Sequence, residues 1–489
     1  MNSPHGELEL TSHEESLQWK GNNMKLLFSK LLAVGWLLLG CGSLFAAETA
    51  LDRYIAQPDP AYTYRLIKTV EVKGAKAHII DMTSQSWLTT NEVDRPIWTH
   101  RMTIIQPPQV KSSKSLLMIT GGRNSSEPSE KPDDMLIQAA LLTGSVVTEL
   151  KMVPNQPLTF KGDGEPRVED SLIAFTWDKF IRTGDEKWPA RLPMTKSAVR
   201  AMDTVVDFCS KAEGGNLKID GFVIAGGSKR GWTTWTTACV DKRVIGIIPI
   251  VIDMLNIMPS FIHHYEAYGF WAPAVGDYVA MGIMDRFHTQ KYQDLMKIEE
   301  PYQYLERLKM PKFMINASGD QFFLPDSSQF YFHKLPGVKY QRYVPNGDHS
   351  LNGTDAVESL ISNYGAIIYN KPLPTIDWRV KGNGSYNVTS SKRPKSAKLW
   401  QASNPTARDF RVDTIGKVWT STDFALTDDN RWVGTVPTPE KGWKAFFVEL
   451  TFDDSPVPFK TTTDVQVIPD ILPFKGKTPN ADLLKKFTL

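Results

Sequence analysis

A serine lies in a glycine-rich turn between an apolar run and a segment that can form a helix. The turn is Gly226-Gly227-Ser228-Lys229-Arg230-Gly231, and the apolar run before it, residues 221–225, is typical of a buried strand. A strained turn between a strand and a helix can present a serine as a nucleophile, provided that its neighbours are small. The second glycine comes one residue later than in the usual G-x-S-x-G pattern. We predict Ser228 as a nucleophile, with a glycine-rich turn without chemistry as the alternative.

Two further residues at strand ends can complete a catalytic triad with Ser228. A serine nucleophile needs a base that accepts its proton and an acid that orients the base. Asp320 follows the apolar run 312–317, and His349 follows the run 339–344. The order serine, aspartate, histidine along the chain is that of the α/β-hydrolase fold. We predict that Asp320 orients His349 and that His349 activates Ser228, and the alternative for His349 is a surface loop residue.

Other acidic residues compete for the role of the triad acid. Asp253 ends the apolar run 244–252 and is the second choice, because some hydrolases of this fold carry their acid after that strand. Asp326 is expected to cap a helix that begins near Ser327. Asp348 is next to the histidine and would have to fold back on its neighbour. Two further histidines can line the pocket, although core or solvated positions are favoured for both: His263 and His264.

Catalysis by a serine also needs two backbone N–H groups that stabilise the developing negative charge. One is expected from Lys229, the residue after the nucleophile, and the other from the loop that follows the strand 114–120. Paired glycines begin that loop and let the backbone approach a substrate carbonyl closely. We predict Gly122 or Arg123 as the second donor, and a simple turn is the alternative.

The segment 254–310 lies between the strand of the nucleophile and the strand of the acid, and it is rich in aromatic residues. An insertion at this place commonly covers the site as a cap, and aromatic walls bury most of a ligand. We predict that the segment covers the site and selects the substrate. Three of its aromatic side chains are predicted to line the pocket, with a core role as the alternative: Tyr265, Tyr268 and Trp271.

The chain resembles the PhoPQ-activated pathogenicity-related protein family, a group of secreted α/β-hydrolase-like proteins. The segments that carry the resemblance are 119–124, 169–177, 188–196, 201–203, 226–232, 252–256 and 319–323. The resemblance implies the fold and a serine site but no particular substrate. The turn around Ser228 is also similar to the G-C-S-R-x-G elbow of glucuronoyl esterases, where the basic residue after the serine supports the oxyanion. By that analogy, Lys229 adds a charge there.

The chain is long enough for several domains. Residues 48–370 are predicted to form an α/β-hydrolase domain with the cap-like insertion 254–310. Residues 375–470 carry short alternating runs separated by turns, which favour an immunoglobulin-like β-sandwich. Residues 471–489 are assigned to a C-terminal tail. The 56 basic and 54 acidic residues nearly balance, so the charge of the chain does not favour binding to nucleic acid. The sequence has neither cysteines and histidines at metal-ligand spacing nor a phosphate-binding loop, and we therefore predict no cofactor and no metal.

The N-terminus is predicted to be a targeting segment. Basic residues within 24–30 precede an uncharged apolar run at 31–47, as in a bacterial signal peptide. We predict residues 1–47 as leader and signal peptide, with Met24 as an alternative start, cleavage near Ala46 or Ala47, and an exported, periplasmic or secreted protein. A lipid-modified Cys41 is the alternative, and it would bring membrane contact. Two cysteines remain after cleavage and either pair or stay as free thiols: Cys209 and Cys239.

The function favoured by these observations is that of an exported serine hydrolase that acts on carboxylic esters through an acyl-enzyme intermediate. The same triad cleaves amides, so a serine peptidase of the dipeptidyl-peptidase type is one alternative. Either enzyme would take a small-molecule or peptide substrate. The other alternative is a non-catalytic secreted factor, for signalling or for resistance to antimicrobial peptides, that retains the fold.

Overall fold

The computed structural model describes residues 48–125, 127, 129–423, 429–453 and 457–480. The predicted leader, with Met24, Cys41 and the cleavage site, lies outside these residues. Within the described ranges, no helix is long and apolar enough to cross a membrane.

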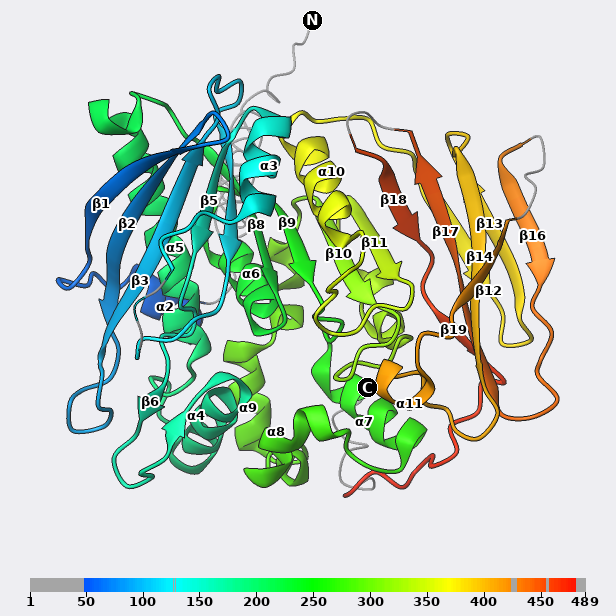
Figure 1. Cartoon of the computed structure of the whole chain (residues 1–489). Coiled ribbons are helices and arrows are strands. Elements are labelled where there is room, and N and C mark those ends of the chain that lie inside the picture. Colours follow the sequence, from blue (N-terminus) through cyan, green and yellow to red (C-terminus); the bar gives the residue numbers. More distant parts are fainter. Residues whose placement is uncertain (1–47, 126, 128, 424–428, 454–456, 481–489) are drawn as a thin grey trace, which may run out of the picture. The chain divides into compact units, whose positions relative to one another are not determined.

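A large mixed sheet forms the centre of the described chain (Figure 1). Its nine strands have the order β1-β2-β3-β5-β4-β8-β9-β10-β11. In this order the first four strands, β1, β2, β3 and β5, pair antiparallel. From β5 onwards, through β4, β8, β9, β10 and β11, all neighbouring strands pair parallel. The strands are β1 (Thr63–Val72), β2 (Ala75–Ser86), β3 (Ile97–Gln106), β4 (Lys114–Ile119), β5 (Val146–Leu150), β8 (Gly221–Gly227), β9 (Val244–Ile250), β10 (Lys312–Ala317) and β11 (Lys339–Val344).

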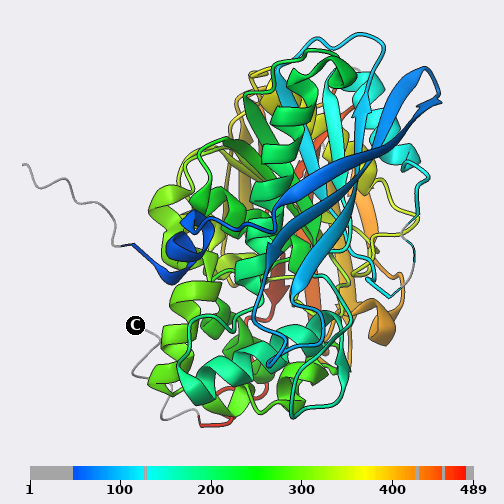
Figure 2. The same cartoon turned by 90° about the vertical axis from the view of Figure 1, so that its left-hand side faces the viewer.

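Helices cover both faces of this sheet. Because both faces are buried, the sequences of its parallel strands are continuous apolar runs. Alternate residues of β8 point to opposite faces: Phe222 and Ile224 join the core on one side, and Val223 and Ala225 join the core on the other. The first side is covered by α5 (Arg191–Ser210) and α6 (Lys229–Val240), and the second by α3 (Asp134–Thr143) and α10 (Ala356–Ile368) (Figure 2). The predicted α/β class is therefore confirmed.

The segment predicted as an insertion, residues 254–310, is helical. It contains α7 (Ile257–Tyr268), α8 (Gly276–Ala280) and α9 (Gln290–Glu299), with short 3-10 helices η2 (Pro273–Val275), η3 (Met284–Arg286) and η4 (Pro301–Arg307). Helix α4 (Glu169–Thr183) packs against α8 and α9, and these helices lie together at the lower side of Figure 1. The remaining short elements are α2 (Ala50–Ala56), β6 (Leu158–Thr159), β7 (Pro166–Arg167), η1 (Ala212–Gly214), η5 (Ser327–Phe330) and η6 (Phe332–Lys334).

The C-terminal region forms two antiparallel sheets. One contains β12 (Ile376–Val380), β13 (Ser385–Ser390) and β16 (Arg431–Thr435), and the other contains β14 (Ser396–Asn404), β15 (Thr420–Asp423), β17 (Trp443–Phe452), β18 (Phe459–Thr462) and β19 (Gln466–Ile468). Apolar residues of both sheets join one core, in which the rings of Tyr386 and Phe446 are 6.4 Å apart. The domain boundaries and the immunoglobulin-like topology stay predictions.

The second C-terminal sheet lies along the edge of the large sheet, where threonine side chains of β18 bind the backbone of β11. The N–H of Tyr343 in β11 donates to the hydroxyl of Thr462 in β18 at 3.0 Å. The hydroxyl of Thr461 donates to the carbonyl of Gln341 at 3.0 Å. The unpaired edge of β11 is thereby covered, which protects it from pairing with another chain.

Candidate active site

Ser228 occupies a strained turn between β8 and α6. Its backbone has φ 55° and ψ −125°, a conformation that costs a non-glycine residue about 1–3 kcal/mol and is typical of functional sites. Its N–H donates to the carbonyl of Ile250 at 2.8 Å, and its carbonyl accepts from the N–H of Trp232 at 3.0 Å. The strand–turn–helix context predicted for Ser228 is therefore present.

The packing around this turn explains why its second glycine comes late. A Cβ atom at Gly226 would lie 2.7 Å from the carbonyl oxygen of Arg230, and one at Gly231 would lie 2.8 Å from the Ile252 side chain and 2.9 Å from the Gly226 oxygen. Both positions therefore need glycine. In the usual pattern the second glycine is two residues after the serine, and that position is Arg230 in this chain.

His349 and Asp320 meet at the carboxyl ends of β11 and β10. The Nδ1 atom of His349 is 2.9 Å and 3.0 Å from the two carboxylate oxygens of Asp320. Asp320 is buried, and its Oδ1 atom also accepts from the N–H of Phe322 at 2.8 Å. An acid held in this way can orient the histidine ring and stabilise its charged form.

The second choice for the triad acid has other partners. One carboxylate oxygen of Asp253 accepts from the hydroxyl of Tyr331 and the other from the hydroxyl of Tyr343, both at 2.6 Å. Burial raises the pKa of Asp253 to about 7, although the two hydroxyl groups favour its charged form. The structure thus brings Asp320, and not Asp253, to His349.

Ser228 and His349 lie at the same edge of the sheet, because β8 and β11 run parallel. Among the described residues, no hydrogen bond joins the hydroxyl of Ser228 to the imidazole of His349. The ring of Phe322 packs against the imidazole with centroids 4.3 Å apart. Hydrogen bonds between catalytic groups often tighten only in the complex with substrate.

Asp326 has a different role from the predicted one. It precedes the 3-10 helix η5, but its side chain makes no capping hydrogen bond. Instead it pairs with Arg408 at 2.6 Å and with Nε2 of His263 at 3.0 Å. Burial opposes the charged carboxylate, but Arg408 and His263 outweigh it and hold the pKa of Asp326 below its ordinary value. The prediction of a cap was wrong because the sequence does not reveal these distant partners.

The other candidates have local or core roles. Asp348 accepts from the hydroxyl of Ser350 at 2.6 Å and does not turn back to the histidine. His263 and His264 are buried, as favoured. The Nε2 atom of His264 accepts from the N–H of Ala272 at 3.0 Å, and burial lowers the pKa of His264 to about 3.

A cavity of about 40 Å³ lies beside Ser228. Its walls are mostly apolar, with three charged residues, and they come from α4, α5, α6, the loop after β9, the insertion and the loop of the acid. The lining residues are Asp170, Trp177, Arg191, Ser228, Lys229, Trp232, Ile252, Met254, Ile257, Phe261, Val275, Tyr278, Phe322 and Phe323. The insertion therefore contributes side chains to this cavity, and its predicted role in covering the site and selecting the substrate stays a prediction.

The three aromatic residues predicted for the pocket do not line this cavity. The ring of Trp271 packs against Tyr265 at 5.0 Å and against Phe261 at 5.9 Å. Tyr268 is buried, with the guanidinium of Arg411 over its ring at 4.9 Å. Tyr268 is thus a core residue, whereas Tyr265 and Trp271 are half-buried. Helical periodicity alone could not tell which aromatic residues face the serine.

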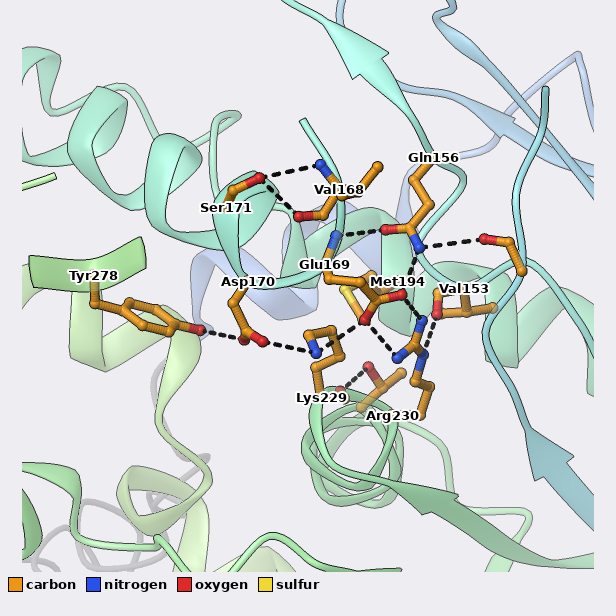
Figure 3. A network of polar contacts seen from close by, with 12 residues as sticks. Val153, Gln156, Val168, Glu169, Asp170, Ser171, Met194, Lys229, Arg230 and Tyr278 are labelled. Carbon is orange, nitrogen blue, oxygen red and sulfur yellow. Dashed lines mark hydrogen bonds and ion pairs between the residues drawn. The ribbon is translucent and has the colours of Figure 1, made fainter. Parts of the chain in front are cut away.

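A network of charged residues joins the turn at Ser228 to α4 (Figure 3). The ammonium of Lys229 lies 2.9 Å from Glu169 and 3.0 Å from Asp170, and the hydroxyl of Tyr278 donates to Asp170 at 3.0 Å. Arg230 forms a two-pronged pair with Glu169 at 2.6 Å and 2.7 Å. Arg230 and Lys229 hold the pKa of Glu169 at about 2, although burial opposes this. The charge of Lys229 is thus shared with two carboxylates, which the analogy with glucuronoyl esterases did not predict.

The sequence carried a signal for this network that the analysis of motifs missed. Two adjacent acids begin α4, and two adjacent cations follow the serine. Glu169 also has a positive φ of 49°, a conformation in which its carboxylate reaches Arg230. The network connects the insertion, through Tyr278, to α6, the helix that follows Ser228.

The glycine loop after β4 lies at the same edge as Ser228, because Ile119 pairs with Gly226 in neighbouring parallel strands. Gly121 accepts from the N–H of Met152 at 2.9 Å, and Gly122 accepts from the side chain of Gln156 at 3.2 Å. Gly122 has φ 144°, which an L side chain rarely adopts. Neither Gly122 nor Arg123 donates its N–H to another described residue.

Cys209 and Cys239 are both buried and free, so the open question of a disulfide is answered in favour of thiols. Burial raises the pKa of both thiols, to about 11 for Cys209. Neither thiol is therefore a nucleophile at neutral pH.

Comparisons with known proteins add the family. The model of the PhoPQ-activated pathogenicity-related protein family matches residues 51–411. Autocrine proliferation repressor protein A of Dictyostelium discoideum is 37% identical over 476 residues, which cover 91% of this chain and 95% of that protein.

Similar solved structures include an acetyl xylan esterase from Paenibacillus sp. R4, with 13% identity, a TM-score of 0.45, and coverage of 64% of this chain and 91% of that chain. A glucuronoyl esterase from Solibacter usitatus has 14% identity, a TM-score of 0.34, and coverage of 57% and 76%. These two likenesses are too distant to support an argument about chemistry. The match of the family model across most of the chain, together with the full-length relative, shows that the chain belongs to the PhoPQ-activated pathogenicity-related protein family.

Proposed function

We propose that the chain is an α/β-hydrolase that cleaves carboxylic esters through Ser228, His349 and Asp320. The observation that carries the proposal is the hydrogen bond between His349 and the buried Asp320, at the sheet edge where Ser228 is held in a strained turn. His349 accepts the proton of Ser228 as its oxygen attacks the acyl carbon, and it then gives this proton to the leaving alcohol. Water hydrolyses the acyl-enzyme by the same two proton transfers.

The apolar part of the cavity beside Ser228 supports a small apolar acyl group. Ile257, Phe261 and Val275 line it, and such a wall suits the methyl group of an acetyl ester. The alcohol part of the ester would remain outside the cavity.

Hydrolysis of two chromogenic substrates, an ester and a dipeptide anilide, tests the proposal and its peptidase alternative. We expect turnover of p-nitrophenyl acetate by the wild-type chain, loss of turnover in Ser228→Ala, and much slower release from alanyl-alanine p-nitroanilide. Ser350→Ala is the matched control, because Ser350 lies next to His349 and its hydroxyl is bound to Asp348. Faster cleavage of the anilide would favour a peptidase, and equal turnover by Ser228→Ala and the wild type would refute the role of Ser228.

A second candidate is a secreted signalling factor, and the name of the Dictyostelium relative favours it. Export is part of the proposal for either function and rests on the predicted leader 1–47. An immunoglobulin-like sandwich over residues 375–470 is likewise proposed. The two functions separate in a growth-inhibition assay with the purified chain: a factor that signals without catalysis keeps its effect in Ser228→Ala, and a hydrolase loses it.

A further inference from the structure

A segment of the C-terminal region lies against the loops that carry the acid and the base. It connects β14 with β15 and contains the short helix α11 (Val412–Ile415). In Figure 1, α11 lies beneath the ends of β10 and β11. We call residues 408–419 the bridging segment.

The bridging segment binds the loop of the acid on both sides of Asp320. The N–H of Val412 donates to the carbonyl of Gly319 at 3.0 Å. A Cβ atom at Gly319 would lie 3.1 Å from both the backbone nitrogen and the Cβ of Val412, so the two chains approach closely at a glycine. On the other side, the side-chain amide of Gln321 donates to Asp413 at 3.0 Å.

The same segment binds the loop of the base through Asn346. The side chain of Asn346 accepts from the N–H of Trp419 and donates to the carbonyl of Trp419, both at 2.9 Å. Trp419 is buried, and its ring packs against Phe447 of β17 with centroids 5.1 Å apart. The loop of His349 is thus fastened to the core of the C-terminal sheet.

Gln321 connects the two loops with each other. Its carbonyl oxygen Oε1 accepts from the backbone N–H of His349 at 2.9 Å, while its amide group binds Asp413. A second link is direct, since the N–H of Gly319 donates to the carbonyl of Gly347 at 3.0 Å. The bridging segment, the loop of the acid and the loop of the base therefore share one set of hydrogen bonds.

A buried ion pair fixes the start of the bridging segment. Arg408 lies 2.6 Å from Asp326, and both side chains are almost fully buried. Asp326 also binds His263 of α7. This end of the segment is therefore anchored to the insertion, and the other end, at Trp419, is anchored to the C-terminal sheet.

We propose that the bridging segment positions Asp320 and His349 relative to each other, and that this is the contribution of the C-terminal region to the site. The catalytic consequence of this positioning rests on the proposed function. The two residues come from different loops, so their contact of 2.9 Å depends on how both loops are held. A catalytic contact needs a geometry within about 0.5 Å, and a misplacement of about 1 Å can reduce a rate about 100-fold.

Two variants remove the links without touching the triad. Asn346→Gly deletes both bonds to Trp419 and still permits the positive φ of 57° at this position. Asp413→Ala deletes the acceptor of Gln321 at an exposed position. Asp377→Ala is the matched control, because Asp377 is an exposed acid of the same C-terminal region and lies in β12.

The readouts are the downfield proton resonance of the His349 Nδ1–H group, kcat and KM for p-nitrophenyl acetate, and Tm. We expect both variants to shift or broaden the resonance and to lower kcat about 10- to 100-fold with KM unchanged, since the contact acts in the transition state. The control should match the wild type. An unchanged resonance and kcat in both variants, whatever the change in Tm, would overturn the proposal. A lost resonance in a chain whose wild type hydrolyses no ester would support positioning and refute the proposed function.

Discussion

Replacing Asp320 by asparagine tests the assignment of the triad acid. The substitution keeps the shape of the side chain but replaces one of the two oxygens that lie 2.9 Å and 3.0 Å from Nδ1 of His349 with an amide nitrogen. That nitrogen carries protons and cannot accept from Nδ1–H. The ring of His349 would then favour the wrong tautomer, and the charged ring that forms during catalysis would lose its counter-ion.

The expected effect is large because both functions of the acid are lost together. In enzymes with this triad, the same change lowers kcat about 10⁴-fold, which corresponds to about 5 kcal/mol of transition-state stabilisation. Oδ1 of Asp320 also accepts from the N–H of Phe322, and an asparagine oxygen can keep that bond. We therefore expect folding to be preserved while turnover is lost.

The assay is hydrolysis of p-nitrophenyl acetate, with Asp253→Asn as the matched variant. Asp253 is a buried carboxylate at the same edge of the sheet, but its partners are Tyr331 and Tyr343. We expect Asp253→Asn to keep most of the wild-type turnover, because its carboxylate does not contact His349. The reasoning is refuted if Asp253→Asn loses turnover while Asp320→Asn remains active.

Three further outcomes are expected. Phe261→Ala enlarges the cavity beside the serine, so the ratio of kcat/KM for p-nitrophenyl butyrate over acetate should rise, and an unchanged ratio would place the acyl group elsewhere. The raised pKa of Asp253, about 7 in the folded chain against 3.8 ordinarily, stabilises the fold below about pH 4, and this contribution is lost as the pH rises through 7. Urea titrations of Asp253→Asn should therefore show a smaller loss of stability between pH 4 and 7 than the wild type. Cys209 and Cys239 should resist a thiol reagent at pH 8 until the chain is unfolded, and fast labelling of the native chain would contradict their burial.

The placement of three candidate residues at one edge of the sheet was predictable, because parallel strands end together at one edge. The apolar runs before Ser228, Asp320 and His349 marked three strands, so the loops after these strands had to lie at the same edge. This local reasoning holds for β8, β10 and β11 because they are buried and leave clear apolar runs. It needs no knowledge of distant partners.

The features that the sequence analysis missed all depend on contacts between distant segments. The sequence predicts a helix cap at Asp326, and only the structure shows that Asp326 pairs with Arg408. Likewise, only the structure shows that Glu169, at the start of α4, pairs with Arg230. Residues 412–421 alternate like a strand, yet the structure has a short helix at Val412–Ile415 before β15, where the stretch contacts the loops of Asp320 and His349.

Labelling by a fluorophosphonate, followed by mapping of the modified peptide, tests the central claim most directly. The reagent reacts with a serine only when a neighbouring base activates it, and no guess about the substrate is needed. We predict a single adduct on Ser228, absent from Ser228→Ala and strongly reduced in a His349→Ala variant. Absence of labelling in the folded wild-type chain, or an adduct on another serine, would contradict the account of this site as that of a serine hydrolase.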